Sequence, residues 1–359
     1  MNRRTFLAAG ACSVAGLCEA GIASPTPQRP AIGKPTRVPM GLVIHSFGFR
    51  SRKPAPPEYP PVATPLDFLA EAARVGAAGV QTNLAAKGSD PKSVRDYAET
   101  HGLFVEGSLG LPKTDSDAAR FSAELEASKA AGAEVVRTVC MPGRRYETFD
   151  SLEQFKKFAD DSWQALRRAE PIAARQNVTL AVENHKDWRT EEMLGWLTKL
   201  SSEWVRACLD TGNSVALLED PLATAEALAP FVATTHLKDM GVAEYADGFL
   251  LSEVPFGDGF LDLQKIVSVV RTANPRVRLN LEMITRDPLK VPCLRPKYWA
   301  TLPTVPAKDL AAALTRVRAN KFPRPLPTTS DLDPAGQLKA EARNIDRCLA
   351  YAAEKLGRI

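Results

Sequence analysis

Residues 178–210 read VTLAVENHKDWRTEEMLGWLTKLSSEWVRACLD, and this stretch decides the fold. Two apolar runs of strand character, 178–183 and 205–210, flank an amphipathic segment over 191–203. Runs this apolar are typical of strands that are buried on both faces of a parallel sheet. The two runs end in Glu183 and Asp210, so the unit that indicates the fold also supplies candidate chemistry.

The same rhythm of a short apolar run followed by a helical pattern extends along most of the chain. Strands are expected at 41–47, 79–84, 103–109, 135–140, 178–183, 205–210, 232–238 and 277–282. Thr64 and Asp90, each followed by Pro, are typical residues for the start of a helix. Eight such alternations predict an α/β fold, a (β/α)8 TIM barrel with an extended segment after strand 8. An open doubly wound sheet is the competing fold, but no glycine-rich phosphate loop follows the first run.

Three parts of the chain lie outside this rhythm. Residues 1–23 contain RRTFL at 3–7 before a mildly apolar stretch, which predicts a twin-arginine signal peptide and a periplasmic or exported protein. Residues 24–39 read as a Pro-rich linker, and the barrel is expected over 40–359. Within it, residues 285–334 are longer than a barrel loop should be, which predicts an extended loop or lid region around one helix at 306–320.

The composition excludes several classes of protein. The 359 residues are 45% hydrophobic and 25% charged, as in a folded globular chain, and the 46 basic and 42 acidic residues give a net charge of +4. This balance argues against a nucleic-acid partner, and no run approaches the roughly 20 apolar residues of a stable membrane anchor. Cysteines 140, 208, 293 and 348 show no CxxC spacing, and whether any two of them form a disulfide stays open.

Four consecutive expected strands each end in a side chain that can bind a metal: Glu183, Asp210, His236 and Glu282. In a parallel barrel the carboxyl ends of all strands face the same rim, where catalytic residues collect. Taken singly, each of these residues is more often a capping or surface residue, but four in a row at matching strand ends predict one metal site. Three carboxylates and one imidazole suit Mn²⁺, Mg²⁺ or Co²⁺, with Zn²⁺ less favoured because no thiolate takes part.

Around these positions the sequence resembles a known family. The runs VENH at 182–185, LDTGN at 209–213, THLKD at 235–239 and PFGDG at 255–259 resemble the sugar phosphate isomerase/epimerase family of xylose isomerase-like TIM barrels. The resemblance implies that Glu183, Asp210, His236 and Glu282 bind one divalent cation. It also implies that Glu183 and Glu282 act as catalytic acid and base on opposite faces of a ketose. Three positions depart from the family's ketose 3-epimerases, which have His, Arg and Glu where this chain has Asn213, Val242 and Arg189.

The chemistry follows from the site itself. A metal bound to a carbonyl and its neighbouring hydroxyl makes the C–H between them more acidic, because an enediolate spreads its charge onto the cation. We therefore expect a divalent-metal-dependent isomerase or epimerase that acts on an unphosphorylated ketose or keto-sugar by proton abstraction through an enediolate. The departures from the family mean that the substrate itself cannot be named from the sequence.

Further polar residues are candidates for contact with the substrate or for support of the metal ligands. We expect substrate binding by residues at or near the strand ends, namely His45, Glu106, His185, Lys238 and Arg286. We expect Asn213 and Asp239 to support the metal ligands from behind.

Two other functions stay open beside the leading one, and a third is disfavoured by the number of histidines. A lyase that eliminates across a 3-keto-glycoside would begin with the same proton abstraction. A non-catalytic sugar-binding barrel would keep the metal as a structural element. A related barrel that cleaves DNA at abasic sites uses three zinc ions and many histidines, whereas this chain has four histidines. The oligomeric state is not indicated, and the expected partner is a small carbohydrate.

Overall fold

The computed structural model describes residues 38–51, 58–86 and 88–357. The chain divides into two units, Met1–Lys34 and Pro35–Ile359, and all described residues belong to the second. The predicted signal peptide and all of the predicted linker except its last two residues lie outside the described residues. Val38 already belongs to the folded body, since its N–H donates to the Gly76 carbonyl at 3.0 Å and its side chain is buried.

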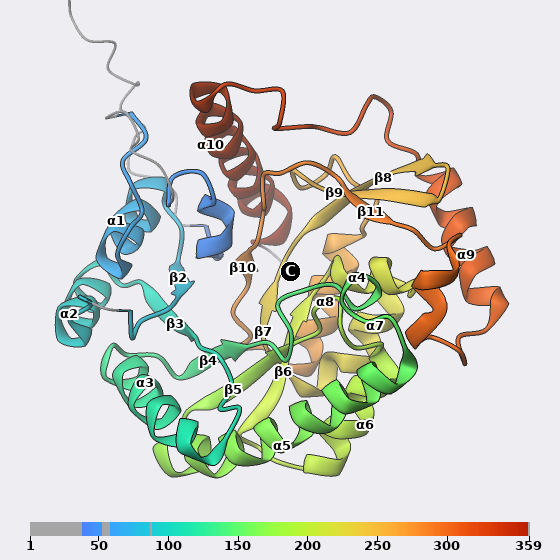
Figure 1. Ribbon diagram of the computed structural model, residues 1–359. Coiled ribbons are helices and arrows are strands. Elements are labelled where there is room, and N and C mark those ends of the chain that lie inside the picture. The colour runs from blue at the N-terminus through green and yellow to red at the C-terminus, as the bar shows by residue number, and fades with distance from the viewer. Residues whose placement is uncertain (1–37, 52–57, 87, 358–359) are drawn as a thin grey trace, which may run out of the picture. The chain divides into compact units, whose positions relative to one another are not determined.

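Eight parallel strands form the barrel, which confirms the predicted fold (Figure 1). They are β1 (Gly41–Val43), β2 (Gly79–Thr82), β3 (Phe104–Ser108), β4 (Val135–Thr138), β5 (Thr179–Glu183), β6 (Val205–Asp210), β7 (Val232–His236) and β10 (Asn280–Leu281). Their order is β10-β1-β2-β3-β4-β5-β6-β7, and parallel bridges from Thr234 to Arg278 and from Leu237 to Leu281 join the last strand to the first. The carboxyl ends of β5, β6, β7 and β10 therefore meet at one rim.

Helices follow the strands around the outside of the barrel (Figure 1). They are α1 (Pro65–Val75), α2 (Pro91–His101), α3 (Ala118–Ala130), α4 (Arg145–Thr148), α5 (Leu152–Gln176), α6 (Thr190–Leu200), α7 (Pro221–Leu228) and α8 (Leu263–Ala273). At α1 the predicted start is confirmed: Thr64 Oγ1 accepts from the Asp67 N–H, and Asp67 accepts from the Thr64 N–H at 2.9 Å. Gly76 then ends the helix with φ of 78°, a conformation that strongly favours glycine.

The first and last strands are shorter than the sequence predicted. β1 ends at Val43, and a 3₁₀ turn, η1 (Ile44–Phe47), follows it, so that His45 lies on a turn at the rim rather than on the strand. β10 keeps two of the six expected residues. Residues 44–47 alternate apolar and polar side chains only loosely, and such a short segment fits a turn as well as it fits a strand, so the sequence pattern alone overextends the element.

A three-stranded antiparallel sheet, two strands of which come between β7 and α8 in the chain, was not predicted. It consists of β8 (Asp239–Tyr245), β9 (Gly248–Val254) and β11 (Leu289–Val291), in the order β11-β9-β8. β11 comes from the predicted lid region, so part of that region is a sheet edge rather than a loop. The same region contains η5 (Pro296–Thr301) and α9 (Ala307–Ala319), the latter at the predicted helix.

The segment after strand 8 packs firmly against the barrel. Tyr298 in η5 is fully buried, and its hydroxyl donates to the Ala216 carbonyl at 2.8 Å. The closing helix α10 (Pro334–Tyr351) continues into a π-helical turn at Ala352–Leu356. Cysteines 140, 208, 293 and 348 are all free thiols. Within the described part of the chain, the search for a helix with the length and apolar character of a membrane span gave none.

Candidate functional site

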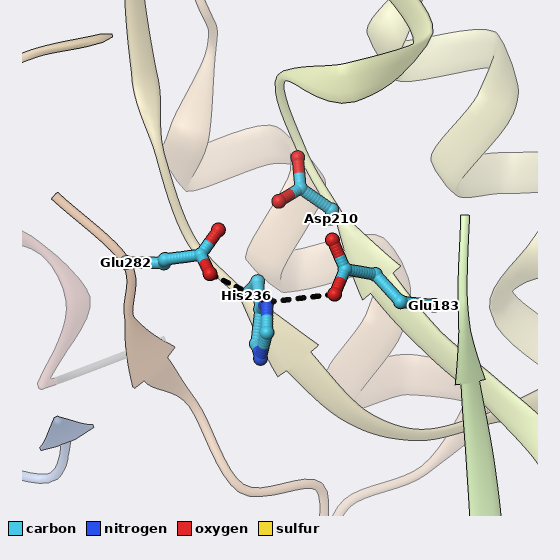
Figure 2. Close-up of side chains that lie close together, drawn as sticks. All are labelled: Glu183, Asp210, His236 and Glu282. Atoms are coloured by element: carbon cyan, nitrogen blue, oxygen red, sulfur yellow. Dashed lines mark ion pairs between the residues drawn. The ribbon is translucent and has the colours of Figure 1, made fainter. Parts of the chain in front are cut away.

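Four side chains from four neighbouring strand ends converge at the rim of the barrel (Figure 2). They are Glu183 at the end of β5, Asp210 at the end of β6, His236 at the end of β7 and Glu282 directly after β10. One ligand atom from each lies within 4.8 Å of the others, and all four residues are buried. The structure thus brings together the four residues that the sequence selected, in a group that could bind a metal ion.

The ring of His236 is oriented by residues of β2 and β3 inside the barrel. Its Nε2 lies 2.6 Å from Gln81 Oε1 on β2, and the Gln81 amide nitrogen donates to Glu106 Oε2 on β3 at 3.0 Å. Because the Gln81 oxygen can only accept, Nε2 carries a proton, which leaves Nδ1 as the ring atom that could bind a metal. Nδ1 points between two carboxylates, 3.3 Å from Glu183 Oε2 and 3.4 Å from Glu282 Oε1 (Figure 2). This is the direction that a metal-binding histidine requires, with the other ring nitrogen held by a hydrogen bond.

Glu183 is held by two donors at the barrel rim. Its Oε2 accepts from Nε of Arg137 at 2.7 Å and also from Nη2, while its Oε1 accepts from the Asn213 side-chain amide at 2.9 Å. Burial raises the pKa of the Glu183 carboxyl, but the charges of Arg137 and His236 outweigh this and hold the pKa well below its usual range. The carboxylate is therefore ionised at neutral pH, as a metal ligand or a proton acceptor must be.

Asp210 and Glu282 share the ammonium of Lys238. The Lys238 Nζ lies 2.9 Å from Asp210 Oδ2 and 2.6 Å from Glu282 Oε2. The other oxygen of Glu282 lies 2.8 Å from Nδ1 of His45, a side chain that is 43% exposed. Asp210 Oδ1 accepts from the N–H groups of Gly212 and Asn213 at 2.9 and 2.8 Å, which fixes the carboxylate direction.

The donor atoms of this cluster fit a divalent cation. His236 Nδ1, Asp210 Oδ2 and Glu282 Oε2 are fully buried, and among the described residues none of them makes a well-directed hydrogen bond. The two carboxylate oxygens are neutralised only by the ion pair with Lys238, and His236 Nδ1 only by the two carboxylates beside it. Buried polar atoms usually make well-directed hydrogen bonds, so three in one place that make none are consistent with a site for a ligand. Three carboxylates with one imidazole are a mainly oxygen donor set, which suits a hard divalent ion.

A cavity of about 640 Å³ opens beside the cluster and is lined by Glu282. Four of the five residues predicted to bind substrate also line it: His45, His185, Lys238 and Arg286. Glu106, the fifth, lies instead beneath His236, fully buried, where it accepts from Gln81, Thr234 and Asn280. Its position favours support of the His236 ring over contact with a substrate.

The two residues expected to support the ligands make different contacts. Asn213 is buried and donates directly to Glu183, as described above. The Asp239 carboxylate instead accepts from the N–H groups of Met240, Gly257, Gly259 and Leu261 at 2.8 to 3.1 Å. Asp239 therefore fixes the loop between β9 and α8, and it reaches the cluster only through its neighbour Lys238.

Sequence reasoning missed three buried polar residues that lie near the cluster or the cavity. Gln81 stands in an apolar strand, and a lone amide in such a run is a usable signal of a buried polar contact. Lys186 follows Glu183 by three residues, lines the cavity and is 3% exposed. Glu253 lies on the unpredicted strand β9 and binds Arg286 through two hydrogen bonds, at 3.1 and 2.5 Å.

Comparisons with known proteins agree with this architecture. A family model described as the xylose isomerase-like TIM barrel matches residues 69–314, which is more than half of the chain. The curated 3-oxo-isoapionate decarboxylase of Pectobacterium atrosepticum is 30% identical over 118 residues, which span 32% of this chain and only 43% of that protein.

Two solved structures share the fold at low sequence identity. A xylose isomerase-like TIM barrel protein from Mycobacterium smegmatis in complex with magnesium has a TM-score of 0.52 and 17% identity, covering 77% of this chain and 97% of its own. The 3-keto-D-glucoside 4-epimerase of E. coli has a TM-score of 0.51 and 13% identity, covering 79% of this chain and 100% of its own. At these identities the two structures support the fold alone.

Proposed function

Because the chain belongs to the xylose isomerase-like TIM barrel family, we propose that it is a divalent-metal-dependent isomerase or epimerase of an unphosphorylated ketose or keto-sugar. The observation that carries the proposal is the buried cluster of Glu183, Asp210, His236 and Glu282, whose four ligand atoms lie within 4.8 Å of one another. The donor set favours Mn²⁺, Mg²⁺ or Co²⁺ over Zn²⁺. The cavity of about 640 Å³ beside the cluster has a volume typical of small-molecule sites.

Each residue of the site would have a separate role in proton transfer. A divalent cation held by the four side chains would polarise a sugar carbonyl and its neighbouring hydroxyl, which acidifies the C–H between them. Glu183, kept ionised by Arg137 and Asn213, faces the cluster from one side, and Glu282 faces it from the other. One carboxylate takes the proton and the other returns one. His45 connects Glu282 with solvent, and Lys238 supplies positive charge beside the developing enediolate.

Where the proton returns decides the reaction. Return to the opposite face of the same carbon inverts the centre, which is epimerisation, whereas return to the neighbouring carbon interconverts aldose and ketose. A leaving group beside the carbanion would be expelled instead, which is the elimination expected of a lyase acting on a 3-keto-glycoside.

A second candidate function, decarboxylation of a 3-oxo sugar acid, is favoured by the match to 3-oxo-isoapionate decarboxylase. In that reaction the bond between the carboxyl carbon and the α-carbon breaks, its electron pair forms an enolate, and CO₂ leaves. The enolate then takes up a proton. A divalent ion at the cluster and the ammonium of Lys238 would stabilise this enolate as well. The geometry of the cluster therefore accommodates either reaction.

The test is solvent exchange in deuterated water. The Mn²⁺-loaded protein is incubated with a panel of ketohexoses and with a 3-keto-glycoside, and the carbon-bound protons are followed by NMR. Exchange without cleavage supports an isomerase or epimerase, release of the aglycone supports the lyase, and binding without exchange supports a non-catalytic barrel. Glu183→Gln and Glu282→Gln should each abolish exchange while the fold persists. Glu219→Gln removes a carboxylate outside the cluster and serves as the matched control. Wild-type exchange in either cluster variant would refute the assignment of these two glutamates.

We also propose that the protein is exported through the twin-arginine pathway. Support comes from the sequence alone, from the Arg3-Arg4 pair and the mildly apolar stretch that follows. A reporter fused after residue 39 should reach the periplasm, and the Arg3→Lys, Arg4→Lys double variant should retain it in the cytoplasm. Equal export of both fusions would contradict the proposal.

A further inference from the structure

The charges around the cavity are strongly one-sided. Its lining contains four side chains that are cationic at neutral pH, Arg137, Lys186, Lys238 and Arg286, but a single carboxylate, that of Glu282. Three of the four cations have carboxylate partners: Arg137 binds Glu183, Lys238 binds Asp210 and Glu282, and Arg286 binds Glu253. Lys186 is the exception, because it forms no ion pair with a described carboxylate.

Lys186 is a buried cation with no described carboxylate within ion-pair distance, although the charges of Glu253 and Asp210 act on it from farther away. Its side chain is 3% exposed, and its only hydrogen bond in the described part of the chain goes to the side-chain oxygen of Asn213. No ion pair joins Lys186 to a described carboxylate. Burial and the neighbouring charge of Lys238 lower the pKa of Lys186 to about 8, so the ammonium is still mostly protonated at neutral pH. An ammonium has three N–H donors, and one hydrogen bond leaves two for a ligand in the cavity.

The sum of the charges around the site also favours an anionic ligand. The four cations of the cavity face four carboxylates, those of Glu183, Asp210, Glu282 and Glu253. These charges cancel, so the two charges of a bound divalent ion are left over. Burial raises the pKa of two further nearby carboxyls, Glu106 and Asp187, that of Asp187 to about 8, and this favours their neutral forms. A neutral ketose would leave the loaded site with an excess of positive charge, which an anionic ligand removes.

We propose that the substrate of this site carries a carboxylate, and that Lys186 binds it, with Arg286 as the second cation at the same cavity. The inference rests on the proposed metal-dependent function and narrows its substrate class from keto-sugars to keto-sugar acids. Lys186 supplies a buried point charge, while Arg286 adds a planar guanidinium whose position is fixed by Glu253. The carboxylate takes the place of the counter-charge that Lys186 lacks among the residues described.

Two pairs of ligands test the charge without changing the rest of the sugar. L-sorbose and 5-keto-D-gluconate differ only by a carboxylate in place of a CH₂OH group remote from the ketone. D-fructose and 2-keto-D-gluconate differ in the same way beside the ketone. Binding is measured by calorimetry on the Mn²⁺-loaded protein, and we expect an acid to bind about tenfold to a hundredfold more tightly than its neutral partner. D-fructose 6-phosphate is measured as well, and tighter binding of this ligand than of either acid would overturn the choice of carboxylate.

Variants of Lys186 test whether this residue causes the tighter binding of the acids. Lys186→Met keeps the length of the side chain and should abolish the preference for the acid, whereas Lys186→Arg should keep most of it. Lys265→Met, which removes an exposed charge on α8, is the matched control and should leave the preference intact. If Lys186 only supports Asn213, Lys186→Met weakens the acid and the ketose equally, which overturns the proposal. So does equal affinity of the wild type for both members of each pair.

The binding assay separates this inference from the proposed function. A carboxylate preference without solvent exchange would refute the isomerase or epimerase while the assignment of Lys186 stands. Exchange on neutral ketoses without a preference for acids would refute the assignment of Lys186 alone. Circular dichroism and urea unfolding of Lys186→Met confirm that any loss of preference does not come from a loss of fold.

Discussion

Gln81 offers the sharpest test of the candidate metal centre, because it acts on the cluster through one hydrogen bond. Gln81→Leu keeps the shape of the side chain but removes the acceptor that lies 2.6 Å from His236 Nε2. The ring then loses the bond that fixes its tautomer and direction. Loss of such a partner lowers metal affinity about 10- to 100-fold, or about 1.4 to 2.7 kcal/mol in the free energy of metal binding.

The same substitution also affects the fold, and the two effects can be separated. The buried His236 N–H loses its partner, which costs about 1–3 kcal/mol of the free energy of unfolding. Glu106 still accepts from Thr234 and Asn280, so the barrel interior keeps most of its hydrogen bonds. Urea unfolding in the presence of EDTA measures this cost without metal.

Metal affinity is measured by competition of the protein with a fluorescent chelator for Mn²⁺. Gln176→Leu is the matched control, because it removes a half-buried glutamine whose amide binds Ser122 on the outer helices. This variant should retain the wild-type affinity. The reasoning would be refuted if folded Gln81→Leu bound Mn²⁺ as tightly as the wild type, since the ring would then need no orientation from β2.

Three further predictions concern metal binding and acid stability. Asp210→Asn keeps an oxygen for the two backbone donors but loses charge, so Mn²⁺ affinity in the chelator assay should fall further than in Gln81→Leu, and an equal affinity would count against Asp210 as a ligand. Mn²⁺ at a hundred times its Kd should raise the free energy of unfolding of the wild type by about 2.7 kcal/mol in urea melts, and no stabilisation would mean that the folded state does not bind the ion. Arg50 and Arg74 lower the pKa of buried Glu71 from 4.5 to about 2 against the effect of burial, so its stabilisation is complete above pH 4.5 and is lost as the pH falls toward 2. Glu71→Gln should lower the free energy of unfolding by about 3 kcal/mol at pH 7, because buried Arg50 loses its counter-charge. In urea titrations the variant should also lose most of this dependence of stability on pH. An unchanged pH profile would show that the ion pair contributes little.

The eightfold pattern of strand and helix could be predicted because each barrel strand is buried on both faces and reads as an apolar run. The hairpin β8–β9 has no counterpart in that rhythm, although Asp247-Gly248 is a typical hairpin signal. An insertion between a barrel strand and its helix leaves the barrel itself intact, so the overall pattern gives no warning of it. The residue Glu253, which the hairpin contributes, was missed for the same reason.

The four cluster residues could be predicted because parallel strands carry their carboxyl ends to a common rim, whatever their distance in sequence. Gln81 could not be assigned to His236 in this way, since the two residues are 155 positions apart and meet inside the barrel. Lys186 shows a different limit. A lysine in a charged segment suggests a solvated surface, and only the packed structure shows that this one is buried without a carboxylate partner.

The hydrogen bonds from β2 and β3 that orient His236 affect the stage of folding at which the candidate metal site is complete. The imidazole belongs to the second half of the barrel, but the residues that aim it, Gln81 and Glu106, belong to the first half. Glu282 follows the strand that closes the ring, so a nascent chain still short of that residue lacks one ligand and the closure that brings the halves together. Metal binding at this candidate site would therefore require the complete ring, and neither half expressed as a separate fragment should bind the ion.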